Sequence, residues 1–127
     1  MGFLSKFSGP LLSILRLVSG LLYMEHGMTK LFQFPPTEMF ATAPAVGSFM
    51  WVAGVLEFVG GALLVIGLFT PVAAFILSGM MAIAYWTVHA QQSFYPVQNG
   101  GDAAILFCFL FLYLAAAGPG RFAVNNK

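Results

Sequence analysis

The chain has 127 residues, of which 60% are hydrophobic and only 7% are charged, and its net charge is +1. Because a soluble domain carries about 25% charged residues, this composition excludes an ordinary water-facing surface, and the near-zero charge excludes a basic surface for nucleic acid. The single cysteine, Cys108, excludes an internal disulfide and a CxxC redox pair. We therefore expect an all-α integral membrane protein whose outer solvent is lipid.

The first apolar segment covers about residues 10–32, and a membrane-spanning helix needs roughly 20 such residues. Lys6 followed by an apolar run is also typical of a signal peptide. However, Arg16 interrupts the run, and no small-x-small cleavage site follows it. We expect a retained helix that ends before Pro35 and Pro36, because proline disfavours a helical conformation in the residue before it.

Two more apolar segments cover about residues 46–69 and 71–90, after a loop over residues 33–45. Thr70 and Pro71 predict a tight turn between them, because threonine can cap a helix and proline suits its first position. These two segments are therefore expected to form neighbouring antiparallel helices.

The fourth apolar segment is short and covers about residues 102–118. Turn-forming residues precede it over 91–101, and Gly118–Pro119–Gly120 ends it. Four segments with short connections predict an antiparallel four-helix bundle, which is a single transmembrane domain over residues 1–127.

The cations predict the orientation of this bundle. Four spans place both termini on one side of the membrane, and that side carries Lys6, Arg121 and Lys127. The opposite loops carry no Lys or Arg beyond Lys30, which lies at a helix end. The positive-inside rule therefore predicts that both termini are cytoplasmic.

Ionisable side chains at membrane depth mark candidate functional positions, because they are costly unless paired or hydrated. On the first helix, a turn of about 100° per residue places Arg16, Tyr23 and Lys30 on one face with two glycines. His26 flanks this face, whereas Glu25 lies roughly opposite Arg16.

Glu57 lies near the middle of the second helix, on the side that carries three glycines. Small residues let another helix approach closely, so we expect Glu57 to be buried inside the bundle. Three interpretations remain open for it: an ion pair with Arg16 or Lys30, a proton-carrying or ligand-binding carboxylate, and burial in the protonated form.

The predicted topology gathers polar residues at one depth, because the first and third helices end on the outer side, where the second and fourth begin. It predicts a polar pocket in the outer half, with Glu57 beneath it and the loop around Asn99 as a lid. Arg16 lies deeper, as a structural charge partner. The ligand-binding or proton-exchanging candidates are His26, Lys30, Glu57, Tyr85, His89, Asn99 and Asp102.

Two histidines at similar depth, His26 and His89, raise the question of haem, which needs axial ligands that face each other. No Cys/His cluster has metal-ligand spacing, the methionines are dispersed, and each histidine can be satisfied by a structural hydrogen bond. The sequence therefore disfavours haem and predicts no metal site.

Several motifs, taken in order along the chain, resemble those of the DoxX family of small bacterial membrane proteins. They are Arg16 with Gly20, His26–Gly27 and Lys30, then Glu57-Phe58-Val59-Gly60-Gly61, Gly67–Leu68 with Thr70–Pro71, His89, Asn99-Gly100-Gly101-Asp102-Ala103-Ala104, and Gly118-Pro119-Gly120-Arg121. Two features depart from the family pattern: Asp102 stands where glutamate is usual, and Glu25 has no counterpart.

The resemblance implies a four-helix protein of the bacterial inner membrane. It also implies a link to membrane-associated redox and oxidative-stress complexes, because the family name is shared with a subunit linked to an archaeal thiosulfate:quinone oxidoreductase. We expect an accessory subunit with a quinone or small-molecule pocket, acting with a partner redox protein and open to homo-oligomerisation. A scaffold for a partner enzyme and a small proton-coupled transporter remain alternatives. No nucleotide loop or nucleophile–base motif favours a stand-alone enzyme.

Overall fold

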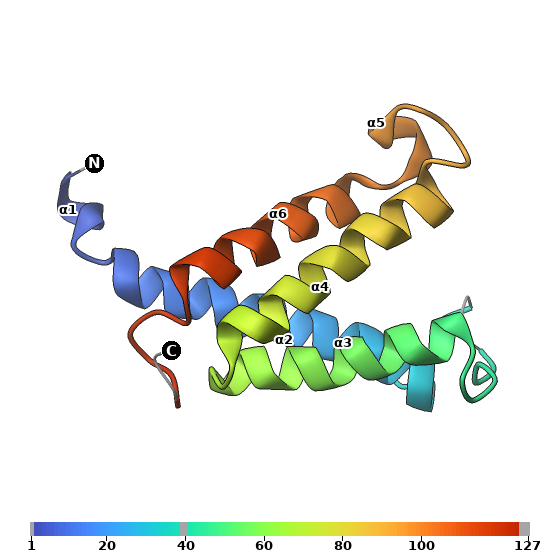
Figure 1. Ribbon diagram of the computed structural model, residues 1–127, viewed down its shortest axis with the longest axis horizontal. Helices are drawn as coiled ribbons and strands as arrows, with labels where there is room; N and C mark the ends of the chain where they lie inside the picture. The colour runs from blue at the N-terminus through green and yellow to red at the C-terminus, as the bar shows by residue number, and fades with distance from the viewer. Residues whose placement is uncertain (1, 39–40, 125–127) are drawn as a thin grey trace.

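The computed structural model describes residues 2–38 and 41–124, and within these ranges the chain is helical and has no β-strand. Long helices make up most of it (Figure 1). In chain order the elements are α1 (Gly2–Ser5), α2 (Ser8–Phe32), α3 (Phe49–Ile66), α4 (Thr70–Ala84), the π-helix η1 (Tyr85–His89), α5 (Pro96–Asn99) and α6 (Asp102–Ala117).

Local capping explains why α3 is shorter than the expected range of 46–69. The Ser48 hydroxyl accepts a hydrogen bond from the Trp51 backbone N–H at 3.3 Å, which fixes the start of the helix. At the other end, Gly67 adopts a φ of 74°, and its N–H bonds the Leu63 carbonyl at 2.9 Å. Glycine adopts this left-handed conformation readily, so it ends the helix.

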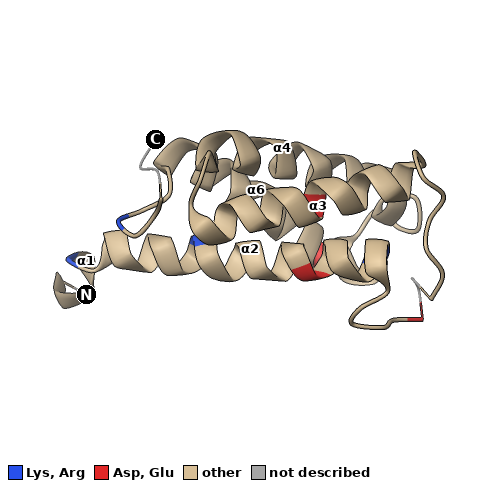
Figure 2. Ribbon diagram, turned by 90° about the horizontal axis from the view of Figure 1, so that it is seen from below, with Lys and Arg blue, Asp and Glu red and all other residues tan. Residues whose placement is uncertain are grey.

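The long helices pack as two pairs, α2 with α3 and α4 with α6, joined by a smaller contact between α3 and α4. Figure 1 shows that the two pairs diverge toward the end that carries α5 and the loop before α3. The start of α2 and the segment after α6 lie at the opposite, closed end. Apart from Lys30, the Lys and Arg residues within 2–38 and 41–124 lie in the half that contains this closed end, whereas the Asp and Glu residues lie in the other half (Figure 2).

Glycines set the close crossing of α2 and α3. A Cβ atom at Gly27 would lie 2.5 Å from the Phe58 backbone nitrogen, and one at Gly61 would lie 2.6 Å from the Met24 nitrogen. Both distances are too short for any side chain, so the two backbones touch directly. Small residues have this role where transmembrane helices meet, and the crossing holds the middle of α2 against α3.

Arg16 ties the segment after α6 to the closed end, and the charge partner expected from the sequence is replaced by carbonyl groups. Its side chain is buried, its Nε donates to the Leu64 carbonyl at 2.7 Å, and its guanidinium also donates to the Pro119 carbonyl. Leu64 lies in the last turn of α3, where carbonyls lack the usual partner four residues further on, and its carbonyl also accepts a bond of 3.2 Å from the Gly67 N–H. The Ser13 hydroxyl adds a second tie, because it accepts from the Phe122 N–H at 2.9 Å.

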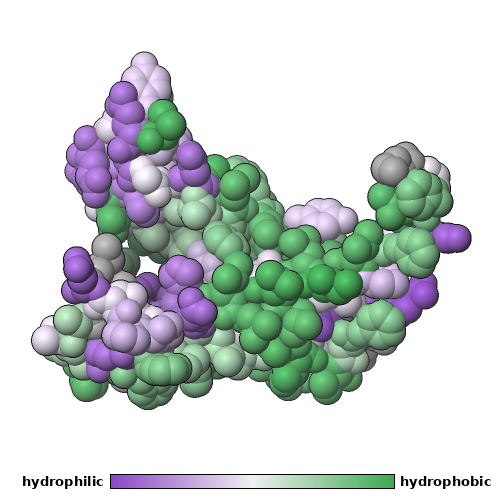
Figure 3. Space-filling model, turned by 180° about the vertical axis from the view of Figure 1, so that it is seen from behind, coloured by the Kyte–Doolittle hydropathy of each residue, from purple (hydrophilic) through white to green (hydrophobic). Residues whose placement is uncertain are grey.

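The outer surface is strongly apolar. Two helical stretches, Phe49–Ile66 and Thr70–His89, are long and apolar enough to cross a membrane, and only 28% and 33% of them are buried inside the protein. A core helix of a soluble protein would be mostly buried, so these helices suit a lipid environment. Figure 3 shows the hydrophobic surface across the middle of the molecule and hydrophilic residues toward its ends.

Candidate functional site

A cavity of about 340 Å³ lies between the two helix pairs. All of the long helices and η1 contribute to its wall, and the surface is hollowed at the end where the pairs diverge (Figure 3). A volume of this size suits a small organic molecule. The wall contains polar groups from Tyr23, His26, Lys30, Glu57 and His89, beside apolar side chains that include Met80, Met81 and Phe107.

Lys30 and Glu57 form an ion pair at this wall, in which the Lys30 ammonium donates to Glu57 Oε1. The two side chains are only 13% and 2% exposed. The sequence left Arg16 and Lys30 open as partners of Glu57, and the structure selects Lys30. Burial of Glu57 inside the helix assembly, expected from its glycine-rich face, is confirmed.

The second carboxylate oxygen of Glu57 is the unusual atom of the cavity wall. Oε2 is buried, yet it accepts no hydrogen bond from the part of the chain that the structure describes. An unsatisfied buried acceptor costs about 1 to 3 kcal/mol. Such atoms are rare in folded proteins, and this one lacks a donor beside a cavity that a ligand can enter.

Tyr23 was not among the predicted site candidates, although the sequence placed it on the same helix face as Lys30. Its side chain is 4% exposed, and its hydroxyl donates to the sulfur of Met81, a weak acceptor. The ring stacks on His26 with centroids 5.4 Å apart and packs edge-on against Phe107 at 4.8 Å. Tyr23 therefore joins α2 to α4 and α6 across the cavity.

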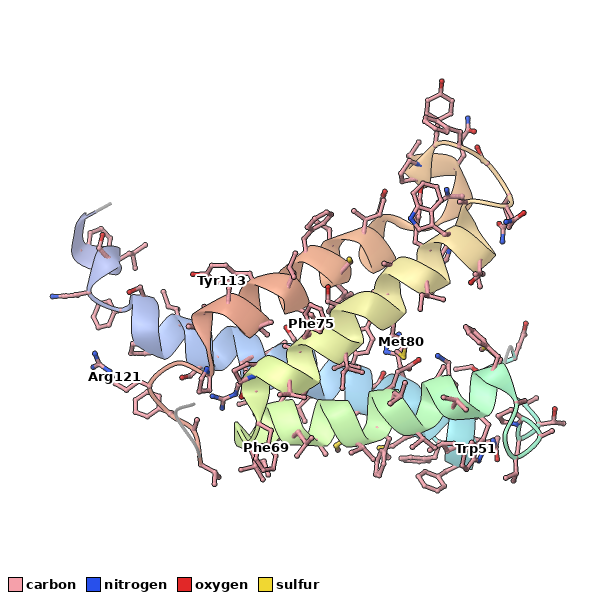
Figure 4. The ribbon with its side chains drawn as sticks, in the orientation of Figure 1. Trp51, Phe69, Phe75, Met80, Tyr113 and Arg121 are labelled. Carbon is pink, nitrogen blue, oxygen red and sulfur yellow. The ribbon has the colours of Figure 1, made fainter. Side chains whose placement is uncertain are left out.

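The methionines of the wall were also missed. Met50 comes from α3, whereas Met80 and Met81 come from α4. Figure 4 shows Met80 on the side of α4 that faces the α2–α3 pair. Met50 is distant in the sequence from the adjacent Met80 and Met81 and joins them at the cavity wall through tertiary packing, so no sequence motif could have found this set. Their flexible thioethers give the cavity an adaptable apolar side.

Both candidate histidines line the cavity, from opposite helix pairs. His26 Nδ1 lies 2.6 Å from the Leu22 carbonyl of its own helix, and His89 Nδ1 lies 3.0 Å from the Asn99 carbonyl. Each bond fixes a ring orientation and leaves the other ring nitrogen to face another partner. Over residues 2–38 and 41–124, no group of three or more His, Cys, Asp or Glu side chains could hold a metal ion.

Asn99 and Tyr85 lie behind the cavity wall. The Asn99 side chain is 3% exposed and donates to the Ser93 carbonyl at 2.9 Å and to the Tyr85 hydroxyl at 3.3 Å. Its Oδ1 accepts from the Gly101 N–H at 2.8 Å. These bonds hold the loop between η1 and α6 in one conformation, so Asn99 organises the loop.

Asp102 lies apart from the other candidates. It is the first residue of α6 and is exposed, whereas its neighbours Ala103 and Ala104 line the cavity. A carboxylate in the first turn of a helix interacts favourably with the helix dipole. The sequence placed Asp102 at the start of its helix but could not give its direction around the helix axis.

The wall therefore places a charged donor, a carboxylate acceptor and the His26 imidazole on the α2–α3 pair, and it places the His89 imidazole beside the apolar side chains of the other pair. This arrangement can hold the polar end of a small apolar molecule, and its carboxylate and imidazoles can exchange protons with that molecule.

Comparison with known proteins gives a family but no assigned activity. The sequence pattern of the DoxX family matches residues 11–90, which contain every polar residue named above for the cavity wall. A protein of Haemophilus influenzae, described only as an uncharacterized protein, is 43% identical over all of this chain and 97% of its own length. No solved structure matches the chain.

Proposed function

The chain belongs to the DoxX family, and we propose that it is a membrane component of a redox or oxidative-stress-linked system that holds a quinone-class molecule between its helix pairs. The observation that carries this proposal is the cavity wall where Lys30 and Glu57 pair and one carboxylate oxygen lacks a donor. A quinone site needs an apolar slot for the ring and one or two proton-exchanging groups. Met80, Met81 and Phe107 supply the slot.

The proposal includes a multi-pass arrangement in the bacterial inner membrane, with α2, α3, α4–η1 and α6 as an antiparallel four-helix transmembrane domain over residues 1–127. The apolar stretches Phe49–Ile66 and Thr70–His89 support two of the spans. α2 has 25 residues, which is enough to cross about 30 Å of hydrocarbon. α6 has 16 residues and needs the interfacial region at one of its ends.

The proposal also places both termini in the cytoplasm. Lys6 comes just before α2 and Arg121 follows α6, so both belong to the closed end of the helix pairs, and the positive-inside rule assigns such an end to the cytoplasm. Lys127, which the sequence also offered, lies outside the described residues. In this orientation the cavity opens toward the outer half of the membrane.

In this proposal the chain is an accessory subunit, which binds the ligand while a partner redox protein exchanges electrons with it. The cavity wall supports a binding role, because its charged groups are engaged with each other and form the polar end of an apolar slot.

The test is direct ligand binding by protein purified in lipid nanodiscs. Ubiquinone-1, a quinone with a short tail, is titrated by calorimetry into the wild type and into Glu57→Leu/Lys30→Met, which removes the pair without stranding a charge. Wild-type binding with at least about tenfold loss in the double variant is expected, since a site that hydrogen-bonds its ligand loses much affinity without those bonds.

The control is Glu25→Gln, which removes an exposed carboxylate on α2 that lies outside the cavity wall. It should bind like the wild type. Absence of quinone binding in the wild type would overturn the proposal. The scaffold alternative would then be favoured if a partner enzyme still required the chain, and the transporter alternative if reconstituted vesicles showed proton-coupled flux.

A further inference from the structure

The segment after α6 folds back onto the first turns of α2. Gly120 permits this contact, because its φ is 84° and a Cβ atom there would lie only 2.8 Å from the Ser13 nitrogen and 3.0 Å from the Gly9 carbonyl oxygen. The Ser13 hydroxyl donates to the Pro119 carbonyl at 3.2 Å and accepts from the Phe122 N–H at 2.9 Å. The residues on both sides of position 121 are therefore fixed against α2.

This contact places the Arg121 side chain along the start of α2, at the closed end (Figure 4). A Cβ atom at Gly9 would lie 3.7 Å from Arg121 Nε and 3.9 Å from its Cβ and Nη2, which is ordinary van der Waals contact along the whole side chain. Lys6 comes three residues before Gly9, and its ammonium lies 5.4 Å from the ring centroid of Phe7. The fold thus brings two cations from distant parts of the sequence to the same end of α2.

Both cations are exposed and have no carboxylate partner. In the part of the chain that the structure describes, the only salt bridge joins Lys30 to Glu57, and the Asp and Glu residues lie in the other half (Figure 2). Arg16 differs from these two cations, because its guanidinium is buried and donates to carbonyls. The potential outside the closed end is therefore positive and attracts anions.

Aromatic rings surround the two cations and are exposed as well. The exposed fractions are 60% for Phe3, 46% for Phe7 and 63% for Phe122, and α1 contributes no buried residue. The 25 residues of α2 span roughly 37 Å, which exceeds the hydrocarbon thickness of about 30 Å. Its start therefore reaches the headgroup level, where aromatic rings and the long side chains of Lys and Arg are stabilised together.

We propose that this closed end binds the phosphate group of an anionic phospholipid, with Arg121 and Lys6 as its cations and the exposed rings among the upper acyl chains. The planar guanidinium of Arg121 suits a phosphate, because it can donate two parallel hydrogen bonds. The lipid surface matches both the charge and the exposed rings of this end. The proposal rests on the membrane arrangement given above and does not involve the ligand of the cavity.

The experiment counts bound lipids by native mass spectrometry of the protein in a nonionic detergent. Phosphatidylglycerol, phosphatidylcholine with the same acyl chains and inorganic phosphate are titrated separately. Phosphatidylglycerol is expected to bind at least about tenfold more tightly than phosphatidylcholine, since each cation near an anionic lipid contributes about fivefold in affinity. This preference should shrink at high salt, which screens exposed charges. Inorganic phosphate should not displace the lipid, because it has no acyl chains for the apolar surface.

Substitutions separate a local site from the net charge. Arg121→Gln and Lys6→Gln should each lower the preference about fivefold, whereas Arg121→Lys, which keeps the charge, should lower it less. Arg121→Gln/Glu25→Gln has the net charge of the wild type, because it also removes an exposed carboxylate of α2, and it should bind as weakly as Arg121→Gln. If Arg121→Gln does not fold, Lys6→Gln decides, since Lys6 lies outside the packed turn.

Recovery of the preference in the charge-matched variant would overturn the proposal, because net charge would then explain the binding. Equal binding of the two lipids would also overturn it and would leave the cations to an acidic partner protein. Displacement of the lipid by inorganic phosphate would show a site for free phosphate instead. Ubiquinone-1 binding should be the same in all of these variants, so a failure here is distinguishable from a failure of the proposed function.

Discussion

Removing the ammonium of Lys30 should strand the Glu57 carboxylate in a buried site. In Lys30→Met, both oxygens of Glu57 would lack a donor in a side chain that is only 2% exposed. Breaking a buried pair by removing one partner costs about 3 to 5 kcal/mol. For a chain of this length, that loss lowers the melting temperature by on the order of 10 °C.

The measurement is thermal unfolding in detergent, followed by the fluorescence of Trp51 and Trp86. Replacing both partners, as in Lys30→Met/Glu57→Leu, removes the stranded charge and should recover most of the lost stability. Lys6→Met, which removes an exposed cation near the N-terminus, should leave the melting temperature within about 2 °C. If Lys30→Met were as stable as the double variant, the carboxylate would not be buried as described.

Other variants test the remaining contacts. Gly27→Ala should lower the melting temperature and cost about 1 to 3 kcal/mol of stability, since its Cβ would lie 2.5 Å from the Phe58 nitrogen. Gly79→Ala, at a position where nothing lies within 4 Å of the added Cβ, should be neutral or stabilising. Equal effects of the two substitutions would contradict the close crossing of α2 and α3. Arg16→Met should speed proteolysis of the segment after α6 by releasing two carbonyls, and an unchanged cleavage rate would contradict that tie. Asn99→Ala should raise hydrogen exchange in residues 91–101, and unchanged protection there would show that other contacts hold the loop.

Local signals in the sequence predict most of the helical segmentation. Gly67 ends α3 and Pro71 lies in the first turn of α4 because their backbone preferences act locally. The expected cap by Thr70 is wrong, because Thr70 is the first residue of α4 and Phe69 occupies the cap position without a side-chain bond. The start of α3 was expected three residues too early, at 46, because hydrophobicity alone does not reveal that Ser48 caps the helix. The divergence of the two pairs depends on long-range packing, which the pattern of apolar residues does not encode.

The candidate site was predicted unevenly for the same reason. Lys30 and Glu57 were recognised because charges in an apolar helix are unusual, but their pairing depends on how α2 crosses α3. Asp102 was expected at the same depth as the other candidates, but it is exposed and does not line the cavity. Each step along a helix turns the side chain by about 100°, and the sequence does not show which direction faces the cavity. Tyr23 and Met81 meet across two helices, and no sequence spacing relates them.

Photolabelling tests the central claim, that the cavity between the helix pairs holds the ligand, most directly. An azido-quinone is irradiated with the protein in nanodiscs, and the labelled peptides are identified by mass spectrometry, with and without excess ubiquinone-1. The account predicts protectable labels on both helix pairs, around Tyr23 and Glu57 on one side and around Met80 and Phe107 on the other. Labels confined to the lipid-facing residues, or unaffected by the competitor, would contradict it.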